Sequence, residues 1–282
     1  MPYAPLTPSA ILSSLLLFSS AAFLAFAAAC DGGDKAALIE IKAAFGNPAG
    51  LSSWTSGSPC CSAWSGVECD STTGRVTSLT VFALNVSARV PPAIANLSAL
   101  QSLNLAYNRL YGPLPAFLGP PHLPDLSFLR LDGNRLSGRI PATLTVFDLS
   151  LVGNRLSGPL PPSFAGATFG DVDLGDNRLT GDASFLFGHK KKLNALNLER
   201  NRFEFDLSRV QLPKVMDILK IAHNMIYGRI PAEAAHRKWL QFDVSYNRLC
   251  GPIPQSKYIQ QFGASHFDHN KCLCGPPLAP CS

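Results

Sequence analysis

Two aspartates in the second half of the chain are spaced as a catalytic carboxylate pair could be. Asp171 and Asp173 lie two residues apart, so on a β-strand both side chains point to one face, as glycosidase carboxylates can. No nucleophile with a neighbouring base accompanies them in the sequence. We therefore expect a protein that is not an enzyme, with no catalytic, cofactor-binding or metal-binding residues and no cofactor.

Arginines recur at a fixed place in a repeated motif, directly after an asparagine. Where repeats stack, such arginines form a row, and the planar guanidinium group suits carboxylates at regular spacing. The row therefore predicts a stripe that binds a carboxylated polysaccharide, whereas the alternative is a solubilising row whose aliphatic stems pack on their neighbours. Met225 replaces one member, and the six arginines are Arg109, Arg135, Arg155, Arg178, Arg202 and Arg248.

The elements that must position these side chains follow from a repeat with a period near 23 residues. Apolar residues lie five and three positions before each repeated asparagine, and this spacing points both to one face of a short strand. An eighth, degenerate unit precedes the others, with Leu79 and Val81 aligned and Leu84 at the asparagine position. The asparagines are Asn108, Asn134, Asn154, Asn177, Asn201, Asn224 and Asn247, with spacings of 26, 20, 23, 24, 23 and 23.

This is the signature of a leucine-rich repeat. It predicts an α/β solenoid, a right-handed superhelix of about eight repeats over residues 75–248, whose parallel strands form a concave β-sheet. Each buried asparagine can bond backbone groups of the turn, so stacked units would form a hydrogen-bonded ladder. The short step from Asn134 to Asn154 predicts an abbreviated loop on the convex side.

Most units continue after the asparagine as Leu-x-Gly-x-Ile/Leu-Pro. This form resembles the plant extracellular leucine-rich repeats, which add a second short sheet after the glycine. Residues 179–184 and 203–208 depart from the pattern, so we expect the second sheet to be interrupted at both places.

The first 29 residues carry no charged side chain, and their apolar run ends in three alanines. This is typical of a signal peptide that is removed on secretion, with a lipid anchor at Cys30 as the alternative. No second long apolar run follows, so membrane insertion is not expected. The whole chain has only 15% charged residues and a net charge of +5, too mild a balance to indicate nucleic-acid binding.

Cysteines flank the repeat array where a solenoid needs caps, which we expect over residues 30–74 and 249–282. Strands spaced by about 4.8 Å keep the two groups apart. Excluding adjacent and near-adjacent partners leaves four pairings of the eight cysteines, which are Cys30, Cys60, Cys61, Cys69, Cys250, Cys272, Cys274 and Cys281.

A zinc site is the alternative for the second group, because His266 and His269 lie close to Cys272 and Cys274 in the sequence. Secretion favours disulfides instead.

The N-terminal cap should contain a helix. Asp34 is expected to cap it, and Gly46 and Pro48 to end it. Its apolar positions follow helical spacing, and we expect them to cover the first coil: Ala37, Leu38, Ile41, Ala44 and Phe45.

Several segments are more specific than the general repeat pattern. Residues 60–69 (CCSAWSGVEC) closely resemble the N-terminal cap of plant extracellular leucine-rich repeat proteins. Residues 181–188 (GDASFLFG), 205–207 (FDL), 224–231, 247–254 (NRLCGPIP) and 270–275 (NKCLCG) resemble the plant polygalacturonase-inhibiting proteins. The resemblance implies disulfides joining Cys30 to Cys60, Cys61 to Cys69, Cys250 to Cys272 and Cys274 to Cys281. Members of that family typically have ten repeats, so part of their binding surface would be missing before Asn177.

The same resemblance implies a function. It indicates a secreted, monomeric plant defence protein of the cell wall or apoplast that inhibits fungal endopolygalacturonases, and the arginine stripe would bind pectin or oligogalacturonide. A non-catalytic ligand-sensing or developmental repeat protein without a kinase is the alternative, as is an ice-binding relative. An ice binder would prefer a flat row of Thr or Asn, and the inner face here is charged and irregular.

The outward positions around the strands are mostly acidic, on a chain whose net charge is positive. Such a face suits a partner with a basic cleft, as an enzyme that grips a polyanionic chain would have, unless the carboxylates are merely solvated. Asp217 belongs to the acidic set and Arg200 to the basic one. The predicted partner-binding residues are Phe82, Tyr107, Phe128, Arg130, Asp132, Asp148, Asp171, Asp173, Asp176, Asn197, Glu199, Lys220, His223, Asp243 and Tyr246.

Two glycosylation sequons lie early in the repeat array, at Asn85 and Asn96. We expect both to be accessible to glycosylation in a secreted protein.

Overall fold

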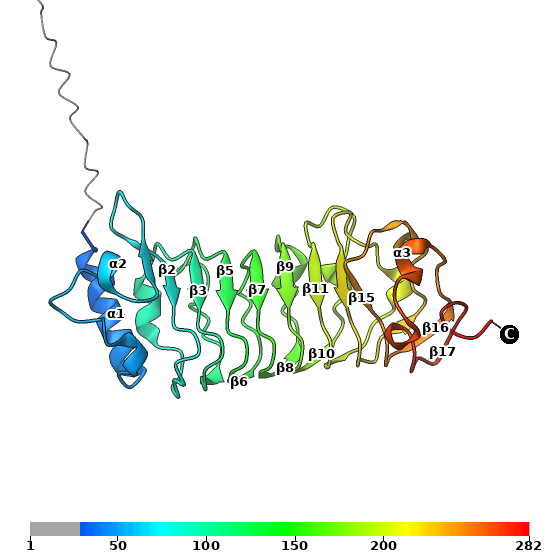
Figure 1. The fold of residues 1–282 in the computed structure, drawn as a ribbon, viewed down its shortest axis with the longest axis horizontal. Coiled ribbons are helices and arrows are strands. Elements are labelled where there is room, and N and C mark those ends of the chain that lie inside the picture. The colour runs from blue at the N-terminus through cyan, green and yellow to red at the C-terminus, as the bar shows by residue number, and fades with distance from the viewer. Residues whose placement is uncertain (1–28, 282) are drawn as a thin grey trace, which may run out of the picture.

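The computed structural model describes residues 29–281, so the predicted signal peptide lies outside the described residues, except for its last alanine. These residues form a leucine-rich repeat solenoid whose strands follow one another along its length (Figure 1). Eight strands pair in parallel, which confirms the predicted repeat number. They are β2 (Val76–Thr80), β3 (Ser102–Asn104), β5 (Phe128–Arg130), β7 (Asp148–Ser150), β9 (Asp171–Asp173), β11 (Ala195–Asn197), β13 (Ile218–Lys220) and β15 (Gln241–Asp243).

The core is a continuous column of apolar side chains behind this sheet. The middle residue of each three-residue strand and the residue two positions later are buried, as Leu196 and Leu198 are, because alternate strand residues point to the same face. In the longer β2 the corresponding pair is Leu79 and Val81. No coil could bury these side chains alone, so stacking supplies the stability. No helix of residues 29–281 is both long and apolar enough to cross a membrane.

A second sheet runs along the lower edge in Figure 1. Its first part pairs β4 (Tyr111–Pro113), β6 (Arg135–Gly138), β8 (Arg155–Pro159), β10 (Arg178–Gly181) and β12 (Arg202–Phe203). The expected interruption at residues 179–184 is wrong, because backbone bonding to both neighbours keeps β10 in the sheet despite its altered sequence. The interruption at residues 203–208 is confirmed, since only a bridge from Asp206 to Tyr227 leads on to β14 (Tyr227–Gly228), β16 (Arg248–Pro252) and β17 (Cys272–Cys274).

The convex side consists of short 3₁₀ turns, which let each coil return within about 23 residues. In the coil between Asn134 and Asn154, residues 139–147 join β6 to β7, and this segment is shorter than the corresponding residues 114–127 and 160–170, which confirms the predicted abbreviated loop. The 3₁₀ turns are η2 (Pro92–Asn96), η3 (Pro162–Ala165), η4 (Ser184–Leu186), η5 (Leu207–Arg209) and η6 (Ala232–His236).

The asparagine ladder forms as predicted. Asn154 donates from Nδ2 to the carbonyl of Leu131 in the preceding coil at 2.9 Å and to that of Leu151 at 3.0 Å. Its Oδ1 accepts from the N–H of Leu136 at 3.0 Å. Each such side chain therefore joins two coils. Asn270 makes the same bonds after the last strand, and it was not in the predicted set.

The N-terminal cap covers the first coil with α1 (Gly32–Ala44), which packs against η2. Asp34 does not cap this helix, because Asp31 takes that position and accepts from the Asp34 N–H at 3.0 Å. Asp34 is instead 1% exposed and accepts from Arg75 Nε at 2.9 Å, Arg75 Nη2 at 3.0 Å and the Val76 N–H at 2.7 Å. This pair of a buried carboxylate and a half-buried guanidinium ties the helix to β2.

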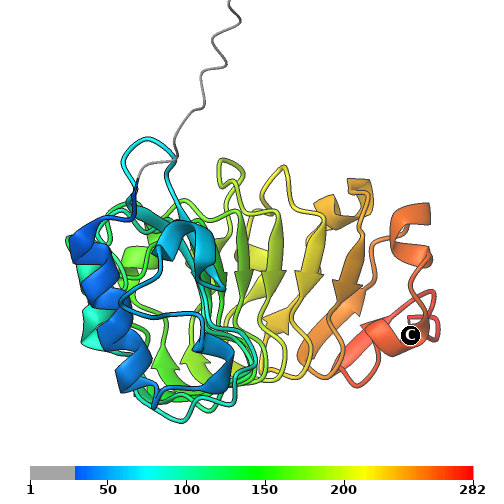
Figure 2. The same ribbon diagram turned by 60° about the vertical axis from the view of Figure 1, so that its left-hand side comes forward.

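The cap elements complete the two ends of the solenoid, which Figure 2 shows from the N-terminal side. At the N-terminal end η1 (Ala49–Leu51) and α2 (Cys60–Ala63) precede β1 (Val67–Cys69), which pairs antiparallel with β2. At the other end lie α3 (Lys257–Gln260) and η7 (Ala264–His266).

Four disulfides close the caps. They join Cys30 to Cys60, Cys61 to Cys69, Cys250 to Cys272 and Cys274 to Cys281, the pairing that the family resemblance implied. The zinc alternative is wrong, because both of its cysteine ligands are consumed in disulfides.

Candidate functional site

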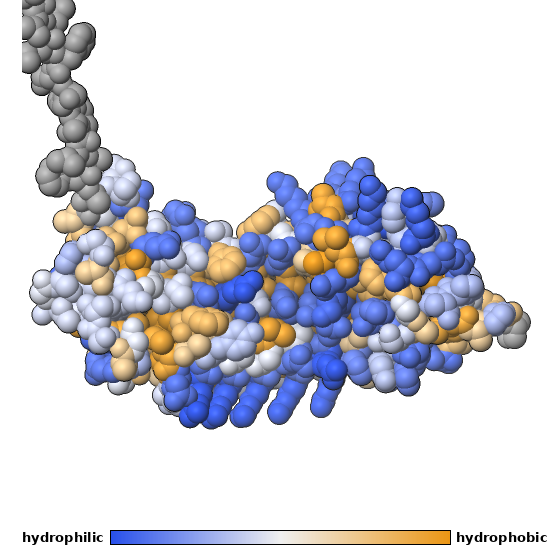
Figure 3. Space-filling model, in the orientation of Figure 1, coloured by the Kyte–Doolittle hydropathy of each residue, from blue (hydrophilic) through white to orange (hydrophobic). Residues whose placement is uncertain are grey.

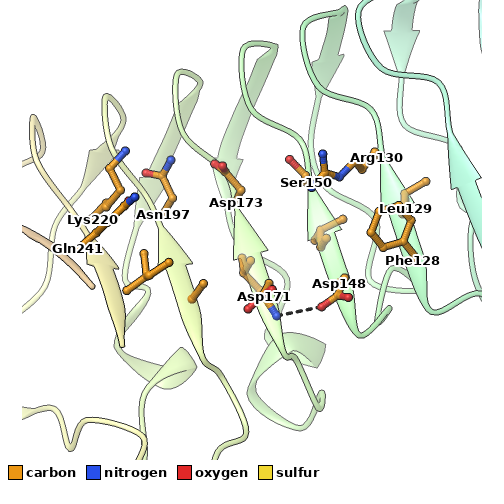
Figure 4. A pocket seen from close by; sticks show the side chains of 14 residues that line it. Phe128, Leu129, Arg130, Asp148, Ser150, Asp171, Asp173, Asn197, Lys220 and Gln241 are labelled. Atoms are coloured by element: carbon orange, nitrogen blue, oxygen red, sulfur yellow. Dashed lines mark hydrogen bonds between the residues drawn. The ribbon is translucent and has the colours of Figure 1, made fainter. Parts of the chain in front are cut away.

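The concave sheet presents two rows of outward side chains, one on each side of the buried middle residue (Figure 4). Strand register aligns them across the sheet. The first row contains Phe128, Asp148, Asp171, Ala195, Ile218 and Gln241. The second contains Arg130, Ser150, Asp173, Asn197, Lys220 and Asp243. Eight of the predicted partner-binding residues therefore lie together.

A shallow hollow of about 270 Å³ lies between these rows at the centre of the sheet. Asp148 and Asp171 face each other at its edge, where Asp148 Oδ1 accepts from the Asp171 N–H at 3.2 Å. Burial raises the pKa of Asp148, and the Asp171 charge raises it further. Arg130 lies over the Phe128 ring, 5.4 Å from its centroid. The hollow thus has acidic, cationic and apolar walls, which suits a polar protein surface more than a single small molecule.

Some predicted binding residues have local structural roles. Asp173, Asn197 and Asp243 each accept from the N–H two residues later, at 3.0 to 3.1 Å. These bonds fix the turn after each strand. Glu199 is paired with Lys220 across neighbouring strands. Asp171 is exposed and has no such side-chain bond among the described residues, so it is the most available carboxylate of the face.

Two acidic residues of the predicted face do not belong to its open surface. Asp132 is only 4% exposed, because the turn after β5 folds it under its neighbours. Asp217 precedes β13 and lines a different hollow with Lys214 and Glu233, on the edge where the strands begin. In each of the two aspartates, Oδ1 is buried and has no hydrogen-bond partner.

Asp132→Asn is expected to stabilise the protein by about 1 kcal/mol at pH 7, since it removes a buried, unpaired charged oxygen. Burial raises the pKa of Asp132, so the folded state holds its proton more tightly than the unfolded state. The unmodified protein therefore loses free energy of unfolding as the pH rises from about 4 through the raised pKa of Asp132. The stability that the variant gains over the unmodified protein should consequently shrink as the pH falls towards about 4. Urea unfolding at both pH values measures this.

The matched control is Asp176→Asn, because Asp176 is exposed and forms only a loose surface pair with Arg200 at 3.7 Å. It should leave the pH dependence of unfolding unchanged. An Asp132→Asn gain of equal size at both pH values would contradict the interpretation.

Of the predicted aromatic binding residues, Phe128 lies in β5, whereas Phe82, Tyr107 and Tyr246 lie beside the strands, in the turns that follow them. The residue before each ladder asparagine has a positive φ, about 50° to 56° at Tyr107, His223 and Tyr246. Tyr107 packs edge-on against Phe82, with centroids 5.5 Å apart. Tyr246 is sandwiched between His223 at 4.0 Å and His269 at 4.1 Å, with nearly parallel rings. His269 was not among the predicted residues. It directly precedes Asn270, as Tyr246 precedes Asn247 one repeat earlier, and this repeat spacing is the signal that could have identified it.

The arginine stripe lies on the lower edge. Arg135, Arg155, Arg178, Arg202 and Arg248 begin strands of the second sheet, and Arg109 lies two residues before β4. All six side chains are exposed. Figure 3 shows hydrophilic side chains projecting in a row there. Within residues 29–281, only Arg248 has a carboxylate within 4.0 Å, that of Glu204 at 3.3 Å. Lys271, after Asn270, extends the stripe and was missed.

Both sequon asparagines, Asn85 and Asn96, are exposed. Asn85 follows Leu84 in the degenerate repeat, so it occupies the position that arginine takes in later repeats.

Comparisons with known proteins agree with this architecture. Residues 31–70 match the leucine-rich repeat N-terminal domain, and residues 99–120 match a leucine-rich repeat. A solved plant ice-binding protein has 34% identity and a TM-score of 0.64, covering 90% of this chain and 99% of its own. The PEPR1–AtPEP1 structure has 27% identity and a TM-score of 0.67, covering 81% of this chain and 33% of its own.

Curated relatives match almost end to end. The polygalacturonase inhibitor of Pyrus communis is 40% identical, covering 97% of this chain and 98% of its own. Polygalacturonase inhibitor 2 of Arabidopsis thaliana is 37% identical, covering 96% and 97%. Both alignments run over 333 positions although this chain has 282 residues, so these relatives are longer by about the length of two repeats. The chain belongs to the polygalacturonase-inhibitor family of leucine-rich repeat proteins.

Proposed function

We propose that this protein is secreted and inhibits fungal endopolygalacturonases by placing its concave sheet over the substrate cleft. It acts as a monomer, by binding and not by catalysis. The observation that carries the proposal is the pair of rows around Asp148 and Asp171, an acidic centre on a molecule of net charge +5. A cleft that binds a polyanionic pectate chain would present the opposite charge, so attraction would speed and orient the encounter.

A titration of purified protein against a panel of fungal endopolygalacturonases tests the proposal. We expect inhibition of at least one enzyme at micromolar protein, weakened by added salt because exposed charges are screened. No inhibition of any enzyme at that concentration would overturn it and favour the ligand-sensing or developmental alternative.

The ice-binding alternative has the structural similarity to a plant ice-binding protein in its favour. The two rows of the concave sheet nevertheless mix charged, apolar and amide side chains, with Thr80 the only threonine among the aligned strand positions. A repeated threonine or asparagine array is therefore missing from this face. Thermal hysteresis of the purified protein is expected to be absent.

The stripe is proposed to bind de-esterified pectin or oligogalacturonide. Five of its six guanidinium groups have no carboxylate partner within 4.0 Å among the described residues, so they are free for an external one. Changing Arg135, Arg155 and Arg178 to Gln should lower retention on de-esterified pectin at least about tenfold, because each lost guanidinium removes a charge-assisted contact. The matched control changes the same residues to Lys, and equal retention of the Gln variant would contradict the proposal.

A further inference from the structure

Three segments that lead into neighbouring strands form a second basic surface, on the opposite edge from the stripe. Residues 188–192, 211–217 and 232–240 precede β11, β13 and β15. Figure 3 shows hydrophilic side chains around an apolar patch along this upper edge, above these strands. We call this surface the upper-edge patch.

A central carboxylate holds the three segments together. Glu233 Oε2 lies 3.0 Å from His189 Nε2, and Glu233 Oε1 accepts from the Leu212 N–H. Arg237 donates from Nη2 to the Leu212 carbonyl at 2.8 Å and from Nη1 to that of Pro213. The patch is therefore an ordered surface built from three coils.

The charge around this network is unbalanced. Four exposed lysines lie on the three segments, and none has a carboxylate within 4.0 Å among residues 29–281: Lys190, Lys192, Lys214 and Lys238. Glu233 is already occupied by His189 and Arg237. Unpaired lysines on one surface repel one another, and a polyanion would relieve that repulsion.

The floor of the patch has unused hydrogen-bonding groups. A hollow of about 570 Å³ is lined by Lys214, Asp217, Glu233 and Arg237, among others. Within it, Arg237 Nε and Asp217 Oδ1 are buried without a hydrogen-bond partner, so one donor and one acceptor are unsatisfied. A ligand would contact them once the side chains that cover them move aside. Val215, 54% exposed, lines the same hollow.

This combination selects a chemical class of ligand. An acidic sugar offers carboxylates to the lysines, hydroxyls that can both donate and accept, and a C–H face for Val215. An acidic peptide supplies the carboxylates but few hydroxyls for the unpaired groups in the hollow.

We propose that the upper-edge patch is a second binding surface for an acidic polysaccharide. This proposal shares its ligand, an acidic polysaccharide, with the proposed function. It does not depend on pectin binding by the arginine stripe, because the two surfaces share no residue and lie on opposite edges of the sheet. One molecule would then hold two polyanionic chains at once.

Lysine acylation separates the two surfaces, since the stripe contains Lys271 and the patch contains five lysines, four of them exposed. The full chain is treated with an acylating reagent in the presence of oligogalacturonate, of neutral dextran or of polyglutamate. The extent of modification at each lysine is then mapped by mass spectrometry. We expect oligogalacturonate to slow acylation of Lys190, Lys192, Lys214 and Lys238 several-fold, and dextran to have no effect. Lys35, in α1 at the far end of the solenoid, should not change.

Protection of Lys271 alone would overturn the upper-edge proposal and leave the stripe standing. Protection of the four lysines alone would support the patch and show that the stripe does not extend to Lys271, and protection of neither would overturn the patch. Equal protection by polyglutamate would overturn the assignment to a polysaccharide.

A variant provides the second measurement. K190Q/K192Q/K214Q/K238Q should lose the cross-linking of pectate chains, seen as light scattering, while a quadruple Lys→Arg control retains it. Scattering by the Gln variant equal to that of the unmodified protein would contradict the proposal. All four side chains are exposed, so the fold should be unaffected.

Discussion

Asp34→Ala is expected to destabilise the folded protein by about 3 kcal/mol, because it removes charge-assisted hydrogen bonds from Arg75 and leaves the buried Val76 N–H without its acceptor. The carboxylate receives two hydrogen bonds from Arg75 and one from the Val76 N–H, at 2.7 to 3.0 Å. The loss should appear as a lower urea midpoint for the disulfide-intact protein.

Asp31→Ala is the matched control, since Asp31 is three residues away and caps the same helix. It gives up a single bond, to the Asp34 N–H, and should cost about 1 kcal/mol. An equal loss of unfolding free energy in the two variants would show that the pair of Asp34 and Arg75 contributes no more stability than a helix N-cap does.

Asp171→Lys should weaken inhibition of a sensitive endopolygalacturonase at least about tenfold, or about 1.4 kcal/mol. Asp171 is exposed at the edge of the central hollow, so the change reverses charge where the proposed contact is centred and leaves the core intact. Like charges across an interface cost affinity and slow association. The inhibition constant measured at low and at high salt tests this prediction. The difference in inhibition constant between the variant and the unmodified protein should be smaller at high salt, because salt screens the charges.

Asp125→Lys makes the same charge change in the loop before β5, away from the hollow. It should leave the inhibition constant nearly unchanged. An equal loss in both variants would indicate a response to net charge alone and would contradict a contact centred on the concave sheet.

The repeat architecture could be predicted because its causes are local and periodic. Each asparagine is recognised by the apolar residues that precede it, and the ladder follows from amide chemistry at a fixed spacing. Asn270 escaped this reasoning because cysteines, not an Arg-Leu pair, follow it, although it lies 23 residues after Asn247. Lys271 and His269 were missed with it.

Other features depend on contacts distant in sequence. Whether Asp31 or Asp34 caps the first helix is decided by Arg75, 41 residues beyond Asp34. The burial of Asp132 depends on how the turn after its strand folds, and strand alternation alone does not reveal that. Asp173 and Asp243 face outward as predicted, yet they bond their own turns, which the charge pattern did not indicate.

The separation of the stripe from the concave sheet bears on how the protein would work in a cell wall. A partner held on the sheet would leave the arginines of the lower edge uncovered, so matrix and enzyme could be bound at the same time. Tethering to the matrix would raise the local concentration of inhibitor along the polymer that the enzyme must approach. Even a weak contact with each enzyme molecule would then give high occupancy where degradation takes place.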